Sequence, residues 1–212
     1  QNLTANARQA QAIDPHQHEP DRIIAVLPFF HVFANTCTLN RTVVNGGEMV
    51  MLPRFDAAQV LAAVQRVKAT SLPGVPTMFQ AMVGAPNYAA EKMASLQLIL
   101  YGGITIDPDL LEQIDREWGG KVRHIYGTTE TMSSLYNPDP VGQHATLRPG
   151  FYCRTRLVRI DGEGPDDIVA VGDEGELIAD ATVDTIFTEY LGQPDATAEK
   201  LRDGWYYTGD VF

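Results

Sequence analysis

The sequence contains only two cysteines, Cys37 and Cys153, among its 212 residues. Two cysteines cannot form a disulfide framework and do not match the spacing of metal ligands, so we expect reduced thiols in a cytoplasmic protein. The sequence also lacks any apolar run near the ~20 residues of a transmembrane helix, and its polar N-terminal stretch is unlike a signal peptide. The first residue is Gln1 rather than Met, which suggests that the chain begins partway through a gene product.

Basic residues are scarce as well: 16 Lys and Arg stand against 27 Asp and Glu, a formal net charge of -11. A chain without a basic stripe cannot displace counterions from a phosphate backbone, so nucleic acid is not an expected partner. Hydrophobic residues make up 44% and charged residues 20%, which is typical of a globular protein with a real core. Nothing in the composition indicates an oligomeric state.

Up to about residue 134, predicted strands alternate with predicted helices. Apolar runs closed by Pro or Gly, such as residues 22–27, are typical of strands covered on both faces. Asp56 is a predicted N-cap, followed by Ala57, Val60, Leu61 and Val64 on one helix face. The alternation predicts an α/β fold with a largely parallel sheet and flanking helices. The predicted strands are 22–27, 48–52, 69–72, 96–100 and 122–125, and the predicted helices are 3–13, 32–44, 56–67, 77–83 and 108–118.

Beyond residue 134 the segments become short and β-rich, with turns such as Asp161-Gly162 between them. We expect a small antiparallel, barrel-like subdomain with strands in 153–160, 167–171 and 175–179. The predicted division is an α/β subdomain over residues 1–140 and a β-rich subdomain over 141–212.

Two motifs lie in the part of the chain before residue 134, where predicted strands and helices alternate. Residues 27–33 (Leu-Pro-Phe-Phe-His-Val-Phe) place His31 among aromatic side chains, although such a histidine is more often a core residue. Residues 101–105 (Tyr-Gly-Gly-Ile-Thr) follow a predicted strand, and paired glycines there allow a flat ligand or a backbone to approach closely. A tight turn is an equally good explanation of the second motif.

Two more motifs carry polar groups that suit a nucleotide. Residues 126–130 (Tyr-Gly-Thr-Thr-Glu) offer an aromatic face for a base, two hydroxyls for phosphate oxygens and one carboxylate for Mg²⁺. Residues 204–210 (Gly-Trp-Tyr-Tyr-Thr-Gly-Asp) end in Asp210, which could accept hydrogen bonds from two ribose hydroxyls. Each motif alone is also compatible with an ordinary turn.

In this order and spacing, the four motifs resemble the adenylate-forming superfamily of acyl-CoA and aryl-CoA ligases, luciferases and peptide-synthetase adenylation domains. The resemblance covers nearly the whole chain, residues 23–212, and includes Gly-Glu-Leu at residues 175–177. It implies a fragment of the large N-terminal domain of that family. It also implies ATP-dependent activation of a small-molecule carboxylic acid to an acyl-adenylate, followed by transfer to CoA, with ATP, Mg²⁺ and CoA as cofactor or co-substrates.

The resemblance also implies roles for particular residues. Tyr126 would pack against adenine, Thr129 would hydrogen-bond the α-phosphate, Glu130 would hold Mg²⁺ and Asp210 would bind the ribose. His31 would lie beside the carboxylate of the acid. The remaining implied nucleotide contacts are Gly102, Gly103, Ile104, Gly127 and Thr128. The implied acyl pocket comprises Val32, Phe33, Gly74, Val75, Ile104, Ile125, Gly127, Met132 and Ser133 beside His31.

Members of the superfamily also carry a glycine-rich phosphate loop ending in Lys upstream, and a lid domain with a second Lys downstream. Neither is recognisable in this sequence, so we expect a central fragment that is inactive by itself.

The nature of the acid is left between two classes. Residues 126–136, 148–151 and 193–201 are closely similar to halobenzoate-CoA ligases of the 4-chlorobenzoate type, whereas 27–34 and 52–55 resemble long-chain fatty-acyl-CoA ligases. We therefore expect a benzoate-like acid first and a medium- or long-chain fatty acid second, with no evident counter-ion for the far end of the substrate. A non-catalytic binding module of the same fold is the remaining alternative.

Overall fold

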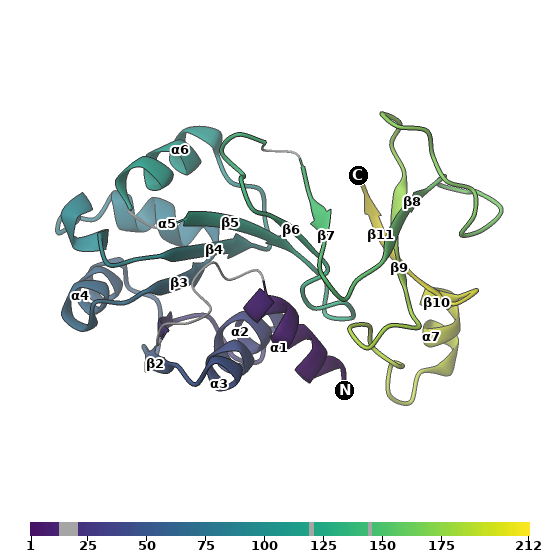
Figure 1. The fold of residues 1–212 in the computed structure, drawn as a ribbon, viewed down its shortest axis with the longest axis horizontal. Coiled ribbons are helices and arrows are strands. Elements are labelled where there is room, and N and C mark those ends of the chain that lie inside the picture. Colours follow the sequence, from purple (N-terminus) through teal and green to yellow (C-terminus); the bar gives the residue numbers. More distant parts are fainter. Residues whose placement is uncertain (13–20, 119–120, 144–145) are drawn as a thin grey trace.

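The computed structural model describes residues 1–12, 21–118, 121–143 and 146–212. It forms a larger α/β lobe and a smaller β-rich lobe, joined by a single crossing of the chain (Figure 1). His16, His18 and His144 lie outside the described residues.

Two sheets organise the two lobes. The larger sheet has seven strands in the order β2-β1-β3-β4-β5-β6-β7, and β1 to β5 run parallel while β6 and β7 pair antiparallel. This confirms the predicted α/β fold with a largely parallel sheet. The strands of the larger sheet are β1 (Arg22–Ala25), β2 (Glu48–Met51), β3 (Ser71–Gly74), β4 (Leu98–Gly102), β5 (Lys121–Tyr126), β6 (Leu135–Asn137) and β7 (Arg148–Pro149).

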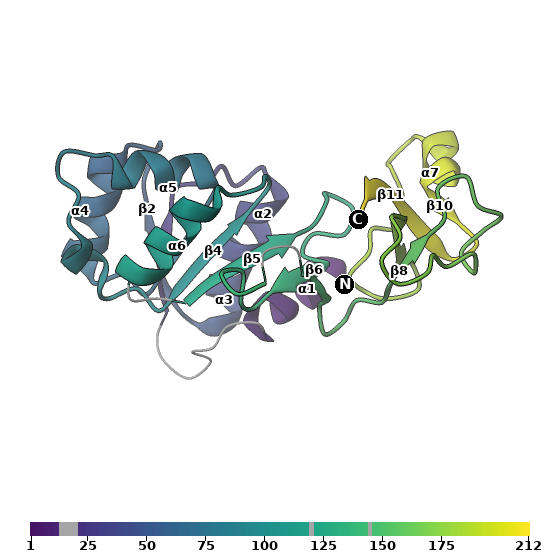
Figure 2. The same ribbon diagram turned by 90° about the horizontal axis from the view of Figure 1, so that it is seen from above.

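Helices cover both faces of this sheet (Figures 1 and 2). On one face, α4, α5 and α6 pack against Ile99 and Tyr101 of β4, and on the other α1 and a π-helix pack against Leu98 and Leu100. The alternation follows from the period of two along a strand. The helices of this lobe are α1 (Asn2–Ala12), α2 (Val32–Ala34), a π-helix (Asn35–Asn40), α3 (Arg41–Asn45), α4 (Ala57–Val67), α5 (Pro76–Val83), a 3-10 helix (Ala90–Met93) and α6 (Pro108–Glu117).

Capping residues begin the two longest helices after β2. The Asp56 carboxylate accepts a hydrogen bond from the Gln59 N–H at 2.9 Å, as its predicted N-cap role requires. Asp107 caps α6 through the N–H groups of Asp109 and Leu110. Both helices therefore begin where the sequence predicts them.

Three local predictions need correction. The strand predicted to end before Pro73 runs through Gly74, because β3 pairs with β1 only at Ser71 and the missing N–H of Pro73 leaves no partner unsatisfied. The single helix predicted over 32–44 contains the π-helix. The strand predicted over 167–171 is reduced to an isolated bridge between Val158 and Ile168.

A buried ion pair ties the first strands to the helices beneath them. Arg41 is fully buried, and its Nη2 lies 2.5 Å from Asp21 Oδ2 and 3.1 Å from Ser71 Oγ. The other Asp21 oxygen accepts a hydrogen bond from Thr70 Oγ1 at 2.6 Å. Asp21 therefore joins α3, β1 and the start of β3 through charge-assisted hydrogen bonds.

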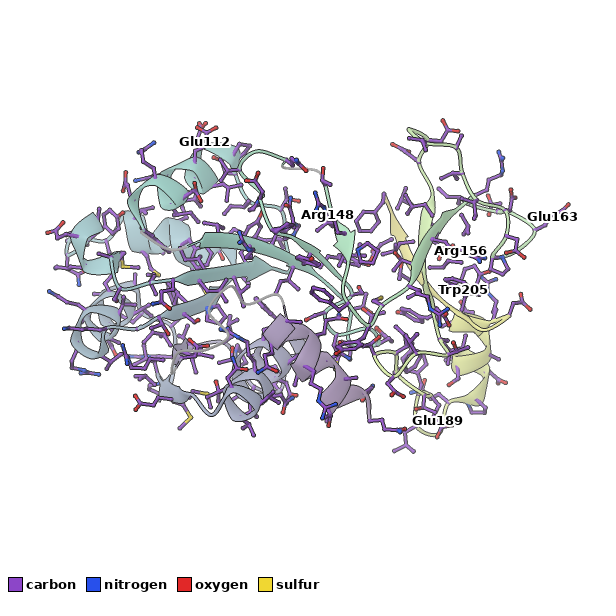
Figure 3. The ribbon with its side chains drawn as sticks, in the orientation of Figure 1. Glu112, Arg148, Arg156, Glu163, Glu189 and Trp205 are labelled. Atoms are coloured by element: carbon purple, nitrogen blue, oxygen red, sulfur yellow. The ribbon has the colours of Figure 1, made fainter. Side chains whose placement is uncertain are left out.

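The smaller lobe is an antiparallel sheet in the order β10-β11-β9-β8, which confirms the predicted β-rich subdomain. The Arg156 guanidinium lies 4.4 Å from the ring centroid of Trp205 on its surface (Figure 3). The elements of the smaller lobe are β8 (Thr155–Val158), β9 (Glu176–Asp180), α7 (Pro194–Lys200), β10 (Leu201–Arg202) and β11 (Trp205–Val211). The chain passes from one sheet to the other between Pro149 and Thr155, and the domain boundary at residue 140 stays a prediction. Within the described ranges, no helix has the length and apolar character needed to cross a membrane.

Candidate functional site

The predicted site residues of the larger lobe lie at one edge of the sheet. His31 follows β1, Val75 follows β3, Gly103 follows β4 and Gly127 follows β5. Because these strands are parallel and adjacent, their carboxyl ends lie side by side, which is where ligands bind in open α/β sheets.

The turn after β5 is fixed by its own backbone. A Cβ added to Gly127 would lie 1.6 Å from the carbonyl oxygen of Met132, so no side chain fits there. The Met132 N–H donates to the Thr128 carbonyl at 2.7 Å, and Met132 itself has a φ of 57°. The Thr131 Oγ accepts from the Thr128 N–H at 3.0 Å and closes the turn. Thr129 and Glu130 are therefore presented from a rigid loop.

One pocket, of about 690 Å³, combines this turn with the end of the smaller lobe. Tyr126 donates its hydroxyl hydrogen to Asp210, across 84 residues of sequence, and its ring meets Phe212 edge-on at 5.0 Å. Burial, followed by the hydrogen bond to Asp210, raises the pKa of Tyr126, so the hydroxyl remains a neutral donor. The predicted nucleotide residues in its wall are Gly103, Ile104, Tyr126, Gly127 and Asp210.

Asp210 reaches this pocket because β11 is irregular. The register between β11 and β9 shifts between Tyr207 and Val211, and Gly209 has a φ of 83°. A bulge of this kind re-aims the side chains that follow it. The Gly209 N–H is held by Glu176 Oε1 at 2.9 Å and the Asp210 N–H by Thr208 Oγ1 at 3.0 Å.

The same pocket contains residues that sequence reasoning missed. His124 lies half-buried on β5 and stacks on Tyr101 with ring centroids 4.6 Å apart. Burial lowers the pKa of His124, which favours the neutral ring. The signal was present in the sequence, because His124 and Tyr126 are two apart on a strand and share a face. Phe212 was also missed.

Glu130 is held by the smaller lobe. Its Oε1 accepts a hydrogen bond from the Tyr190 hydroxyl at 2.7 Å, and its carbonyl oxygen accepts from the Phe187 N–H at 2.8 Å. Burial raises the pKa of Glu130, but hydrogen bonds from Tyr190 and Thr128 outweigh it, and the pKa is lowered overall. The carboxylate is therefore ionised at neutral pH.

The acidic groups of the site suit Mg²⁺ only in combination with a ligand. Among the residues that the structure describes, no group of three or more His, Cys, Asp or Glu side chains could hold a metal ion. Mg²⁺ usually keeps several waters and binds one or two carboxylates together with substrate phosphates. A single ordered carboxylate such as Glu130 fits that arrangement.

A second, larger pocket of about 1100 Å³ adjoins the first and is lined almost entirely by apolar side chains. Gly103 and Ile104 belong to both pockets and form their common wall. It extends over the ends of β4, β3 and β1 to the segment after β2, where the basic residue Arg54 is part of its lining. The predicted acyl residues in its wall are His31, Phe33, Val75 and Ile104.

Other predicted acyl residues lie elsewhere, and their roles stay predictions. Ile125 and Gly127 line the pocket that contains Tyr126 and Asp210, while Ser133 is buried with its Oγ 3.3 Å from Cys37 Sγ. Gly74 is buried behind the apolar pocket, where an added Cβ would lie 2.6 Å from the Phe79 ring. Gly102 ends β4 and lies against the Ile125 carbonyl. Val32, Gly74, Gly102, Thr128, Thr129, Glu130, Met132 and Ser133 line neither of the two pockets.

His31 is oriented by the helix that it caps. Its Nδ1 accepts a hydrogen bond from the Phe33 N–H at 3.2 Å at the start of α2. In the neutral ring the proton is then on Nε2, which can donate to an oxygen in the apolar pocket.

Comparison with known proteins shows the family of the chain. The AMP-binding enzyme family matches residues 1–191, and the chain belongs to that family. It is 38% identical over 185 residues to a 4-chlorobenzoate–CoA ligase of Arthrobacter sp, covering 87% of this chain and 34% of the relative. It is 26% identical over 212 residues to a long-chain-fatty-acid–CoA ligase of Bacillus subtilis (strain 168), covering 100% of this chain and 38% of the relative.

A solved structure shares the fold. The o-succinylbenzoate CoA synthetase from Bacillus subtilis, bound to a product analogue, has a TM-score of 0.84 and 27% identity, covering 99% of this chain and 42% of that one. The chain thus spans between 34% and 42% of the relatives that it matches here.

Proposed function

We propose that a protein containing these residues activates an apolar carboxylic acid with ATP and transfers the acyl group to CoA. One observation carries the proposal: the apolar pocket and the Tyr126–Asp210 pocket meet at a common wall, Gly103 and Ile104. An acid in the apolar pocket and a nucleotide in the Tyr126–Asp210 pocket would bring the carboxylate and the α-phosphate together. Positioning would then supply much of the catalysis.

On the nucleotide side, the proposal assigns roles to Asp210, Glu130 and Thr129. Tyr126 occupies one oxygen of Asp210, which leaves the other free to accept from ribose hydroxyls. Glu130 would hold Mg²⁺, which neutralises phosphate charge when bound, and Thr129 would hydrogen-bond the α-phosphate. The Nε2–H of His31 would hold the attacking carboxylate oxygen. That oxygen attacks the α-phosphorus of ATP and displaces pyrophosphate, which gives the acyl-adenylate. The CoA thiolate then attacks the acyl carbon and displaces AMP.

No covalent nucleophile of the protein takes part in this scheme. Burial raises the pKa of the Cys37 thiol, and burial, followed by Asp180, raises the pKa of Cys153 to about 12. Both thiols are thus protonated and unreactive at neutral pH. We further propose a reducing, cytoplasmic location, since both cysteines are unpaired.

We place a benzoate-like acid first, because the aryl-activating relative is 38% identical against 26% for the fatty-acid ligase. The size of the apolar pocket favours the second candidate, a medium- or long-chain fatty acid. Neighbouring strands are ~4.8 Å apart, so a pocket that crosses from β4 to β2 is roughly 14 Å long, well beyond one benzene ring.

Thioester formation tests the proposal. A full-length protein containing these residues should convert acid, ATP and CoA to acyl-CoA, AMP and pyrophosphate, with benzoates preferred over alkyl acids of equal carbon number. Preference for alkyl acids that benzoates fail to inhibit would reverse the order of candidates. Absence of any acid-dependent AMP would leave the non-catalytic binding module as the better explanation.

The 212-residue chain alone is expected to release no pyrophosphate, because the glycine-rich loop and the lysines of the family pattern are not recognisable in it. A pyrophosphate-release assay with ATP, Mg²⁺ and a panel of aryl and alkyl acids checks this. Acid-dependent release by the purified chain would contradict it.

Replacing Asp210 should weaken nucleotide binding without unfolding the lobe. The Asp210→Asn side chain keeps the shape but loses the charge, and hydrogen bonds to a charged group contribute about 1.5–3 kcal/mol, so an exposed site should lose roughly tenfold in affinity. Titration calorimetry with AMP or ATP gives the value. Asp203→Asn, in the exposed turn before β11, is the matched control and should bind like the parent chain.

A further inference from the structure

The segment between β9 and α7 reaches from the smaller lobe to the turn after β5. Two residues of this segment, Phe187 and Tyr190, contact the same acidic residue, Glu130, one through its main chain and one through its side chain. Sixty residues separate Tyr190 from Glu130, so the contact is a tertiary one that joins the two lobes.

Tyr190 is held in place on its own side of this contact. Its N–H donates to Thr197 Oγ1 at 3.0 Å, at the first turn of α7. Its ring packs on Phe187 with centroids 4.7 Å apart, and Phe187 in turn meets the buried ring of Tyr206 edge-on at 5.5 Å. The hydroxyl therefore approaches Glu130 from a side chain whose rotamer is fixed by packing.

The hydrogen bond fixes the carboxylate as well. A carboxylate offers about four lone-pair sites. Tyr190 occupies one on Oε1 at 2.7 Å, and the hydroxyls of Thr128 and Tyr206 also hydrogen-bond the carboxylate. The Phe187 N–H holds the Glu130 backbone at 2.8 Å, so both ends of this side chain are anchored. The free lone pairs are thus presented in one orientation rather than several.

We infer that Tyr190 is a positioning residue that holds the Glu130 carboxylate in the orientation that receives Mg²⁺ together with the nucleotide phosphates. The inference rests on the proposed function. Mg²⁺ demands near-octahedral geometry, so a lone protein carboxylate contributes most when its direction is set in advance. Partners that orient a metal ligand typically change metal affinity by about 10- to 100-fold when they are removed.

The experiment compares nucleotide binding by the 212-residue chain with Mg²⁺ and with EDTA. The ratio of the two affinities measures the coupling between metal and nucleotide, and a partly unfolded sample lowers both affinities equally. Tyr190→Phe keeps the ring against Phe187 and removes only the hydroxyl. Tyr152→Phe is the matched control, because the Tyr152 side chain is exposed and its hydroxyl bonds no described residue.

We expect Mg²⁺ to tighten ATP binding by the parent chain and by Tyr152→Phe to the same degree. In Tyr190→Phe the gain from Mg²⁺ should fall about tenfold, with the affinity in EDTA unchanged. Glu130→Gln should lose the gain altogether and sets the lower limit of the measurement.

Other outcomes are distinguishable. An equal Mg²⁺ gain in Tyr190→Phe and the parent chain overturns the positioning role and leaves the proposed function standing. An affinity in EDTA that falls as far as the affinity in Mg²⁺ means that Tyr190 only supports the fold, and it overturns the inference too. A 212-residue chain that binds ATP without any gain from Mg²⁺, or that binds no ATP, overturns the inference. The proposed function is tested separately, by thioester formation in the full-length protein.

Discussion

Gly127→Ala is expected to destabilise the chain by more than about 3 kcal/mol and to reduce nucleotide binding below detection. The added Cβ would lie 1.6 Å from the Met132 carbonyl oxygen, and the next atoms in its way are also backbone. Rotation of a side chain cannot relieve a clash with backbone. The turn that carries Thr129 and Glu130 must therefore open, and Tyr126 beside it must move.

Chemical denaturation and ATP titration measure the two effects separately. Gly84→Ala is the matched control, because Gly84 ends α5 with a φ of -83° and an added Cβ would come no closer than 3.4 Å to its neighbours. It should stay within about 0.5 kcal/mol of the parent chain. If Gly127→Ala unfolds at the same denaturant concentration as the control and binds ATP normally, the turn is not rigid and does not set the site.

Local signals account for the parts of the fold that the sequence predicts well. Asp56 and Asp107 begin their helices as N-caps, and the apolar runs around Ile23 and Ile99 lie in a sheet with helices on both faces. Pro73 misled the prediction because a proline is excluded from a strand only where its N–H would be needed. Whether a strand residue needs its N–H depends on which neighbouring strands pair with it at that position. That pairing is set by the tertiary structure and cannot be read from the local sequence.

Some residues of the candidate site could be predicted from local sequence signals, and others could be recognised only from their tertiary contacts. Tyr126 and Asp210 could be singled out because Tyr126 begins one recognisable motif and Asp210 ends another. The hydrogen bond between them follows from how the two lobes dock. Tyr190 lies outside the quoted motifs, and Arg54 lies in residues 52–55, whose resemblance to fatty-acyl-CoA ligases gives it no role. Their relevance comes from distant contacts, 2.7 Å to Glu130 for Tyr190 and the wall of the apolar pocket for Arg54.

Arg41→Ala is expected to destabilise the chain by about 3–5 kcal/mol, because it leaves the Asp21 carboxylate buried without its counter-charge. Arg41 is 0% and Asp21 7% exposed, and their atoms approach to 2.5 Å. Removing both charges should be less harmful: Asp21→Asn combined with Arg41→Met should recover most of the loss, since no ion then needs desolvation. The site should weaken together with the fold, because Asp21 leads into β1 and hence to His31.

Urea unfolding gives the change in the free energy of unfolding, provided that its dependence on urea concentration is the same in all variants. Arg66→Ala, on the exposed face of α4, is the control and should change the free energy of unfolding by less than about 0.5 kcal/mol. A double variant no more stable than Arg41→Ala would mean that Arg41 acts through packing of its long side chain rather than through charge. A single variant as stable as the Arg66→Ala control would contradict the buried pair altogether. The pair bears on the candidate site through the fold, because it anchors the start of β1, the strand whose other end leads to His31.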